Sequence, residues 1–425
     1  MRICVVGAGY VGLTTAATLA DFGHEVQCVD IDHVKIEGLS LGFVPIYEPG
    51  LTELIDKNRK DGRLRFSSQV KESIRDYPVI LIAVGTPPKE DGSSNLSSIH
   101  QVVEIVASTI QEYKIIITKS TVPPGTNEWI YQKLVEMGLD EDRFDIVSNP
   151  EFLREGTALW DILHPNKIVF GTKSDRPIKV LKKLYARGKA PYIFTSLTGA
   201  ELIKYASNAF LATKISFANE MARICDAYDV DYADIAKGLG TDPRIGRHFL
   251  KAGLGFGGSC LPKDLSALKD SATRKKVETK LLDAVMAIND TQIEHYLNKL
   301  GTVLPDLAAK QITVWGVTFK PGTDDSRFSP AIALIEQLIQ KGSHVHTYDP
   351  MVQLQLADVS SFADQYESVN HSDVLIIATE WEQFQKCNWS EVKSRMKGAF
   401  ILDTRNCIDG KTVRREGFIY LGVGI

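Results

Sequence analysis

The sequence predicts an α/β fold in which two doubly wound sheets are joined by a central helical part. Two observations carry this prediction: a strand-helix-strand pattern at the N-terminus and a second such pattern in the last third of the chain. A helical stretch of about 30 residues lies between them. The length of 425 residues agrees with two to three domains.

The composition is that of an ordinary globular protein, with 44% hydrophobic and 24% charged residues. It excludes disordered, collagen-like and coiled-coil chains. The net charge of −4 provides no overall positive field for a nucleic acid, so anionic ligands need local clusters of positive charge. Apolar runs such as Val79–Val84 are too short to cross a bilayer. We therefore expect neither a nucleic-acid nor a membrane partner.

The six cysteines are scattered, without a C-x-x-C pair or a Cys/His cluster. This pattern argues against a zinc site and against a disulfide framework, and it is typical of a reducing compartment. We expect a cytoplasmic protein without a metal.

The N-terminal pattern consists of a strand over Arg2–Val6, the turn GAGYVG, a helix over Leu13–Phe22 and a strand over His24–Asp30. A G-x-G-x-x-G turn with an acid about 20 residues further on is the dinucleotide fingerprint. An isolated glycine-rich turn would be weak evidence, but here the strand, helix, second strand and terminal acid agree.

Each residue of the fingerprint has its own physical reason. Gly7 permits the tight turn, Gly9 lets the backbone approach a pyrophosphate, and Gly12 lets the helix pack on the strand. Asp30 would accept hydrogen bonds from the adenosine ribose, which favours NAD over NADP because a 2′-phosphate would be repelled.

Two further strands, Val79–Val84 and Ile115–Thr118, are followed by GTPP and KSTVPPGT. These small polar residues lie at the carboxyl ends of predicted strands, where open α/β sheets bind their ligands.

The central stretch from Thr198 to Tyr228 has apolar residues at every third or fourth position and only one early glycine. A helix of this length spans roughly 45 Å. It predicts a connector between two sheet domains whose apolar face is also available to a second copy of the chain.

The last third repeats the first pattern with a strand over Gln311–Val317, a helix over Ser329–Lys341 and a strand over His344–Asp349. Strands at Val374–Ala378 and Phe400–Asp403 follow. Because the three-glycine signature is absent, we expect this domain to bind something other than a dinucleotide. The predicted boundaries are 1–196 for the first Rossmann-like domain, 197–300 for the helical domain and 301–425 for the second Rossmann-like domain.

The glycine-rich string FLKAGLGFGGSCLPKD ends in a candidate nucleophile. Cys260 precedes a helix predicted to begin at Leu261–Pro262, and a helix N-terminus stabilises a thiolate. Asp264 follows four residues later on the same face. A lone cysteine is more often a small buried hydrophobe, which is our interpretation of the other five.

Two further i,i+4 pairs are candidates for the same chemistry. Lys204 and Asn208 share a face of the long helix and are suitable donors to a developing oxyanion. Each of them taken alone would be interpreted as an ordinary helix residue. Glu151 and Glu155, in SNPEFLREG, would otherwise be acids in the first turn of a helix.

Taken together, the motifs resemble the UDP-glucose 6-dehydrogenase branch of the nucleotide-sugar dehydrogenases. The resemblance covers the whole chain through GYVGL with Asp30, VGTP, STVPPGT, NPEFLREG, KYASNAF, GFGGSC, PKD and GVTFKPGTDDSR. It implies a homodimeric enzyme with an NAD domain, a helical middle and a C-terminal nucleotide-sugar domain. Such enzymes oxidise the 6-hydroxyl of UDP-glucose to a carboxylate with two NAD⁺ and one water.

The resemblance also implies residue roles. Cys260 would form the thiohemiacetal and the thioester, and Lys204 and Asn208 would stabilise the alkoxide-like oxygen. Asp264, with Thr121 and a bound water, would handle the first proton, and Glu151 would assist thioester hydrolysis. The implied cofactor contacts are Gly7, Gly9, Tyr10, Val11, Gly12, Asp30, Lys35, Thr86, Thr121, Glu155, Lys263 and Arg327. The implied substrate contacts are Glu151, Phe152, Leu153, Glu155, Lys204, Asn208, Arg244, Phe249, Lys251, Phe256, Gly257, Lys320 and Arg405, with Arg244 supplied by the other subunit.

Three alternatives stay open at this point. The substrate could be GDP-mannose or a UDP-N-acetylhexosamine, although the latter branch typically shows GGHC where this chain has GGSC. A two-electron β-hydroxyacid dehydrogenase would need neither the cysteine nor a second α/β domain. A non-catalytic sensor of NAD and a nucleotide sugar would be expected to lack Cys260, Lys204 or Asp264.

Overall fold

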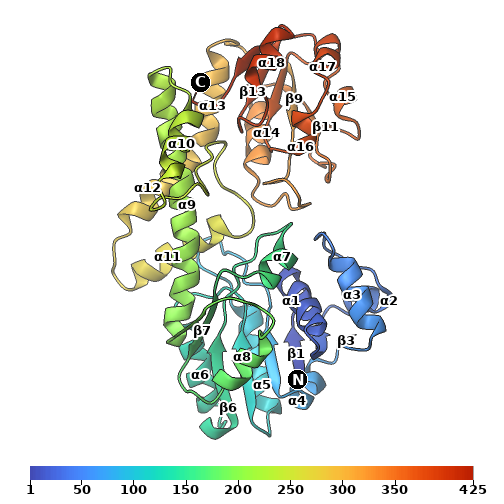
Figure 1. The fold of residues 1–425 in the computed structure, drawn as a ribbon, viewed down its shortest axis with the longest axis vertical. Helices are drawn as coiled ribbons and strands as arrows, with labels where there is room; N and C mark the ends of the chain where they lie inside the picture. Colours follow the sequence, from blue (N-terminus) through green and yellow to red (C-terminus); the bar gives the residue numbers. More distant parts are fainter. Residues whose placement is uncertain (425) are drawn as a thin grey trace. The chain divides into compact units, whose positions relative to one another are not determined.

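A computed structural model describes residues 1–424, and the chain divides into two units. The first unit comprises Met1–Ser207 and Ser266–Val277, and the second comprises Asn208–Leu265 and the chain from Glu278 onward. Two helices, α9 (Leu197–Ala227) and α11 (Leu261–Arg274), have residues in both units. In Figure 1, α9 is the long green helix.

The first unit is built on a doubly wound sheet. Its strands are β1 (Arg2–Val6), β2 (Glu25–Val29), β3 (Leu64–Ser67), β4 (Val79–Ile82), β5 (Lys114–Thr118), β6 (Phe144–Ser148), β7 (Ile168–Thr172) and β8 (Tyr192–Thr195). Their order is β3-β2-β1-β4-β5-β6-β7-β8, and only the β6–β7 pair is antiparallel among the pairings of this sheet. The order places β1 beside β4, where the chain reverses direction along the sheet.

Helices cover both faces of this sheet because successive strand residues point to opposite sides. Ile3 and Val5 pack into the core under α1 to α3 and α8, whereas Cys4 and Val6 pack into the core under α4 to α6. The helices are α1 (Tyr10–Asp21), α2 (His33–Leu41), α3 (Leu51–Lys60), α4 (Val70–Asp76), α5 (Ser97–Thr109), α6 (Thr126–Glu136), α7 (Ala158–Leu163) and α8 (Ile178–Leu184), with a 3-10 turn at Glu141–Arg143.

The strip Ser266–Val277 belongs to the first unit although it comes late in the chain. An added Cβ at Gly92 would lie 2.3 Å from Ser266 Oγ, so the loop after β4 packs directly on this strip.

The second unit contains a parallel sheet and most of the central helices. Its strands are β9 (Gln311–Trp315), β10 (His344–Tyr348), β11 (Val359–Phe362), β12 (Val374–Ile377), β13 (Phe400–Asp403) and β14 (Ile419–Leu421), in the order β11-β10-β9-β12-β13-β14. The remaining helices are α10 (Tyr232–Thr241), α12 (Lys280–Asp290), α13 (Gln292–Gly301), α14 (Pro330–Gln340), α15 (Gln365–Ser368), α16 (Glu382–Gln385), α17 (Trp389–Arg395) and α18 (Gly410–Arg415).

This second sheet also has a core on each face. Ile312 and Val314 pack with α13 and α14, and Trp315 packs on the other face with Phe384 and Trp389. The predicted fold class is therefore confirmed: two Rossmann-like sheets with a central helical region. The observed strands and helices lie within a few residues of the predicted ranges, and α1 begins at Tyr10 because Gly9 is its N-cap.

The second sheet keeps part of the first turn of the fingerprint. Gly316 follows β9 with φ +88° and donates its N–H to Tyr348 O at 2.8 Å, as Gly7 does to Val29 O at 2.7 Å. The position of Gly9, however, is taken by the fully buried Thr318, whose N–H and hydroxyl both donate to Asp349. A threonine side chain here fills the space that a pyrophosphate would need.

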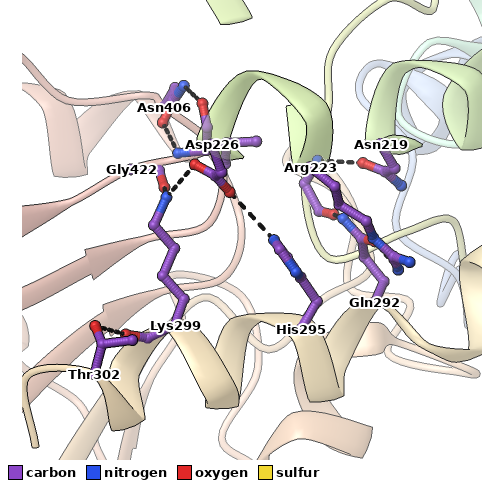
Figure 2. Close-up of polar contacts among 11 residues, drawn as sticks. Asn219, Arg223, Asp226, Gln292, His295, Lys299, Thr302, Asn406 and Gly422 are labelled. Carbon is purple, nitrogen blue, oxygen red and sulfur yellow. Dashed lines mark hydrogen bonds and ion pairs between the residues drawn. The ribbon is translucent and has the colours of Figure 1, made fainter. Parts of the chain in front are cut away.

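A polar cluster in the second unit fixes the segment after β14. Lys299 of α13 donates to Asp226 of α9 at 2.6 Å and to Gly422 O at 2.7 Å, and His295 lies 3.3 Å from the same Asp226 (Figure 2). Asn406 accepts from and donates to the backbone of Val423. These contacts hold the turn after β13, which carries Arg405, against the central helices.

Candidate active site

The glycine turn after β1 has the geometry that the fingerprint predicts. Gly7 adopts φ +106°, and an added Cβ there would lie 2.6 Å from Ala83 O. A Cβ at Gly12 would lie 1.8 Å from Gly7 O, so α1 approaches the strand as closely as the motif requires. At Gly9 an added Cβ meets no atom within 4 Å. The packing of the chain itself therefore does not require a glycine at position 9, whereas a ligand that approaches the backbone closely would require one.

Asp30 is held at the end of β2 by three donors. Its carboxylate accepts from Ala8 N at 2.8 Å and from Asp32 N at 3.0 Å, and Lys35 Nζ lies 3.4 Å away. Helix α1 has no side-chain N-cap bond and no acid in its first turn, so its positive end stays available to an anion. These residues fit a dinucleotide.

Tyr10, at the first position of α1, connects this turn to the NPEFLREG segment. Its hydroxyl bonds to Glu48, and both side chains accept from the N–H of Gly156, at 3.1 Å and 2.7 Å respectively. Burial first, and then the Glu48 carboxylate, raise the pKa of Tyr10. The negative charge of Glu155 adds to this rise, so Glu155 lies near the dinucleotide turn. Val11 follows Tyr10 in α1 and packs on the first core.

The strand ends of β4 and β5 bring two predicted threonines together. Thr86, which is buried, donates from its hydroxyl to Thr121 O at 2.8 Å. The two loops are therefore joined directly, as expected for neighbouring parallel strands whose carboxyl ends share one edge.

Lys204 and Glu151 form a buried ion pair in the first unit. Lys204 Nζ lies 2.9 Å from Glu151 Oε1, and both side chains are less than a tenth exposed. Burial raises the pKa of Glu151, but the charge of Lys204, the N–H of Leu153 and a second lysine, Lys119, outweigh it, so that pKa is lowered overall.

The segment that carries Glu151 and Glu155 is not a helix. Residues 151–154 have no regular structure, and α7 begins only at Ala158. The alternative interpretation, in which both acids lie in the first turn of a helix, is excluded because Glu151 accepts from the N–H of Leu153 at 2.6 Å, which closes a tight local turn. The ring of Phe152 lies 5.5 Å from Lys204 Nζ and 4.4 Å from Lys167 Nζ.

Lys119 and Asn149 belong to this cluster but were not among the residues predicted from the sequence. Lys119 is 7% exposed and donates to Asn149 Oδ1 at 3.3 Å. The signal available in the sequence was the position of each residue directly after a buried strand, β5 and β6, where ligands bind in such sheets.

A second cluster forms around Asp264 in the second unit. Asp264, at the start of α11, is 2% exposed and accepts from Asn208 Nδ2 at 2.6 Å and from Lys263 Nζ at 2.6 Å. The N–H of Asp264 donates to Cys260 O at 2.9 Å, so Cys260 directly precedes the helix as predicted. Cys260 is exposed, and its sulfur lies 3.7 Å from Ser259 Oγ.

The glycine loop before Cys260 is held by side-chain amides. Asn219 of α9 accepts from Gly253 N at 2.7 Å, and Gln292 of α13 donates to Gly253 O at 2.8 Å. Arg223 donates to the oxygen of Gln292 and so fixes the direction of that amide (Figure 2). Asn289 bonds both the N–H and the carbonyl of Phe256, at 2.7 Å and 3.2 Å.

The glycines of this loop are therefore required by packing. An added Cβ at Gly257 would lie 2.2 Å from Phe328 O, and one at Gly258 would lie 2.8 Å from the ring of Phe319. Three backbone N–H groups of the loop, those of Gly253, Phe256 and Gly258, are used within the chain and so are not available to a ligand.

The remaining predicted cations have separate partners. Arg405 donates to Ala378 O at 2.8 Å and lies 3.4 Å from Glu380. Burial raises the pKa of Glu380, but the charges of Arg405 and Lys251 outweigh it and lower that pKa overall. Arg244 pairs with Asp242 and Arg327 pairs with Asp325, at 2.6 Å and 2.7 Å, while Lys320 Nζ lies 5.4 Å from the Phe319 ring. Phe249 is partly exposed with φ +61°.

Across residues 1–424 we find no group of three or more His, Cys, Asp or Glu side chains placed to hold a metal ion. The described helices also include none that is long and apolar enough to cross a membrane.

Comparison with known families assigns the three parts of the chain. Residues 1–189 match the NAD binding domain of the UDP-glucose/GDP-mannose dehydrogenase family, residues 198–291 its central domain and residues 313–410 its UDP binding domain. The chain belongs to this dehydrogenase family. It is therefore a nucleotide-sugar dehydrogenase with an NAD-binding domain.

Relatives of this dehydrogenase match it over their full length. YtcA of Bacillus subtilis, whose naming as a UDP-glucose 6-dehydrogenase is provisional, is 49% identical with complete coverage of both chains. The UDP-glucose 6-dehydrogenase of Rickettsia prowazekii is 40% identical, covering 100% of this chain and 99% of the relative. The solved UDP-glucose dehydrogenase of Pyrobaculum islandicum has a TM-score of 0.93 at 35% identity, and it covers 100% of this chain and 97% of its own.

A dehydrogenase of different specificity is also similar to this chain. The UDP-D-ManNAc dehydrogenase of Pyrococcus horikoshii has a TM-score of 0.90 at 30% identity, with coverage of 100% of this chain and 99% of its own.

Proposed function

We propose that the chain oxidises UDP-glucose to UDP-glucuronate in a four-electron reaction through a thioester on Cys260. The observation that carries the proposal is the placement of Cys260, which is exposed directly before α11 and one helical turn from the buried Asp264–Asn208 pair. A nucleophilic cysteine beside an acid and an amide donor is what aldehyde capture needs. The relatives named UDP-glucose 6-dehydrogenases support the choice of sugar.

The first oxidation removes a proton from the 6-hydroxyl group and a hydride from the carbon that bears it. We assign the proton to Asp264, acting with Thr121 through a bound water. Lys204 and Asn208, one turn apart on α9, donate hydrogen bonds to the oxygen as its negative charge grows. The glycine turn and Asp30 would hold NAD⁺, which would supply the hydride acceptor for each of the two oxidations.

The second oxidation needs a new tetrahedral carbon, and Cys260 provides it. Its sulfur bonds to the aldehyde carbon while the thiol proton passes to the aldehyde oxygen, which gives a thiohemiacetal. Loss of a hydride from that carbon and of the hydroxyl proton leaves a thioester. Water then attacks the thioester with Glu151 as the base, and the carboxylate and the Cys260 thiol are released.

The binding residues inferred by resemblance are part of the same proposal. Lys320, Arg405 and, from a second subunit, Arg244 would gather positive charge for the substrate diphosphate, which a chain with net charge −4 must concentrate locally. The domain limits at 196 and 300 and a cytoplasmic location also remain proposals.

The stoichiometry of NADH tests this function. About two NADH per UDP-glucose consumed is the expected result, whereas one NADH would indicate an aldehyde-producing or hydroxyacid-type enzyme. No NADH with UDP-glucose, but turnover of GDP-mannose or UDP-N-acetylmannosamine, would assign another sugar. Binding of NAD and UDP-glucose without any turnover would indicate a sensor.

The Cys260→Ser variant tests the covalent step. We expect overall turnover to fall by roughly 10³-fold or more, while binding of UDP-glucose measured by calorimetry stays within a few-fold of wild type. A control variant, Cys225→Ser, changes a cysteine buried in the second core and should keep the stoichiometry. Full activity of Cys260→Ser would rule out the thioester.

A further inference from the structure

Lys119 is a buried cation that the proposed chemistry does not yet use. Its side chain lies at the end of β5, 7% exposed, and within residues 1–424 it makes no ion pair with a carboxylate. Its ammonium contacts the amide oxygen of Asn149 at 3.3 Å and lies 5.6 Å from the ring centroid of Tyr185. A buried ammonium without a directly bonded carboxylate is costly, and an apolar side chain would fill the same space.

The partner of Lys119 is fixed in a single orientation. Asn149 donates from Nδ2 to Val169 O at 2.9 Å, and its Oδ1 accepts from the hydroxyl of Tyr185 at 2.7 Å. Because the amide must turn its oxygen toward Tyr185, the same oxygen faces Lys119. The lysine is thus held in place by a polar network built from β6, β7 and the end of α8.

The charged groups that face Lys119 are Glu151 and Lys204. Attraction to Glu151 favours the charged form of Lys119, while repulsion from Lys204 opposes it. Burial is the largest influence and, with Lys204, it lowers the pKa of Lys119 to about 8. Lys119 is therefore mostly protonated at pH 7. In the other direction, the charge of Lys119 lowers the pKa of Glu151.

Two cations thus act on one buried carboxylate, Lys204 by direct contact and Lys119 through its charge alone. Lys204 makes the direct contact with Glu151 at 2.9 Å. When Lys204 donates to a substrate oxygen, as the proposed function requires, its interaction with Glu151 weakens. Burial alone would then favour protonation of Glu151.

We propose, on the basis of the proposed function, that Lys119 is a positioning residue that keeps Glu151 ionised while Lys204 acts on the substrate. Glu151 thereby remains able to orient Lys204 and to accept a proton during thioester hydrolysis. Lys119 itself contacts neither the substrate nor the reacting atoms.

The test compares Lys119→Met with Lys119→Arg and the wild type over pH 4 to 9. Loss of the cation raises the pKa of Glu151, so the acid limb of the kcat profile of Lys119→Met should move to higher pH by about one unit, with KM for UDP-glucose little changed. Toward pH 9, where Lys119 of the wild type has largely lost its proton because its pKa is about 8, the kcat values of the wild type and of Lys119→Met should converge. Lys119→Arg keeps the charge and should restore the wild-type acid limb.

Lys114→Met is the matched control for a merely structural effect. Lys114 lies at the other end of β5, is 3% exposed and donates to the carbonyls of Arg75 and Tyr77, so it is equally buried on the same strand. We expect this variant to lose stability but to keep the shape of the pH profile. A Lys119→Met profile that is lowered equally at every pH, or that keeps the wild-type acid limb, would overturn the proposal.

A measurement without turnover separates this inference from the proposed function. The infrared carboxyl band of Glu151, identified as the difference from the Glu151→Gln variant, gives its protonation midpoint directly. We expect that midpoint to be higher in Lys119→Met than in the wild type and in Lys119→Arg. If the wild type forms no NADH with any nucleotide sugar, the proposed function fails, while an unchanged midpoint would refute the role of Lys119.

Discussion

Lys204 and Glu151 place opposite charges where little water reaches them. Both lose hydration on folding, and their 2.9 Å contact replaces it only as long as both partners are present. We therefore expect a change of either residue to have a large effect on stability as well as on any chemistry at the site. It also defines a test that does not require a substrate.

Removing Lys204 alone should lower the free energy of unfolding more than removing both partners of the ion pair. We expect Lys204→Met to lower the free energy of unfolding by about 3–5 kcal/mol, because Glu151 is left buried with only the weaker help of Lys119. The double variant Lys204→Met with Glu151→Gln should regain part of this loss. Urea denaturation of the wild type, both single variants and the double variant gives the coupling energy, and simple additivity would contradict a strong pair.

The pH dependence of this pair has a definite sign. The pKa of Glu151 is lowered in the folded state, so its contribution to stability is fully present above the ordinary pKa of a glutamate. That contribution is lost as the pH falls through the lowered folded value. The difference in unfolding free energy between the wild type and Glu151→Gln should therefore be constant at neutral pH and shrink in acid.

At the scale of elements, the loop before Cys260 depends on helices far away in the sequence. Asn219 and Gln292, from α9 and α13, bond the two polar groups of Gly253, and Asn289 does the same for Phe256. A side-chain amide carries N–H donors as well as a carbonyl acceptor, so it can replace the neighbouring strand that this isolated loop lacks. These bonds hold the loop in place although it does not belong to a sheet.

Asn289→Leu should loosen this loop. It leaves the N–H and carbonyl of Phe256 buried without their partner, which costs about 1–3 kcal/mol of stability. We expect faster hydrogen exchange over residues 250–260 and weaker binding of UDP-glucose with unchanged binding of NAD. Asn298→Leu, an exposed amide on α13, is the control and should leave both measurements at wild-type values.

The sequence is informative where a local pattern has a single structural solution. The turn of Gly7 to Gly12 and the helix start after Cys260 were predictable because both follow from short-range rules. The loop at Glu151 was not, because i,i+4 spacing after a proline is equally compatible with a helix or with the turn that the Leu153 N–H closes. Lys119 looked like any lysine after a strand, and its burial depends on Asn149 and Tyr185, which are distant in sequence.

At the scale of the whole molecule, α9 leaves an apolar stripe uncovered. Phe210, Phe217 and Ile224 follow each other at seven-residue intervals and are 66%, 44% and 45% exposed. Residues spaced by seven lie on one helix face, which is the arrangement of a helix that packs against a partner. The stripe supports the proposal that the chain forms a homodimer.

Phe217→Glu should disrupt that dimer. A charge in the middle of the stripe would have to be buried without a partner, and we expect light scattering to show monomers at concentrations where the wild type is dimeric. Ile419→Glu, at an exposed apolar position on β14, is the control and should remain dimeric. A wild type that is monomeric at micromolar concentration, or a dimeric Phe217→Glu, would refute this interface.

The late return of Ser266–Val277 to the first unit has a consequence for biosynthesis. The ribosome releases residues 1–207 long before the strip against which Gly92 packs has been translated. The surface of the nascent N-terminal sheet is therefore completed only after part of the second unit has been translated. A fragment that ends at Ser207 lacks that strip altogether.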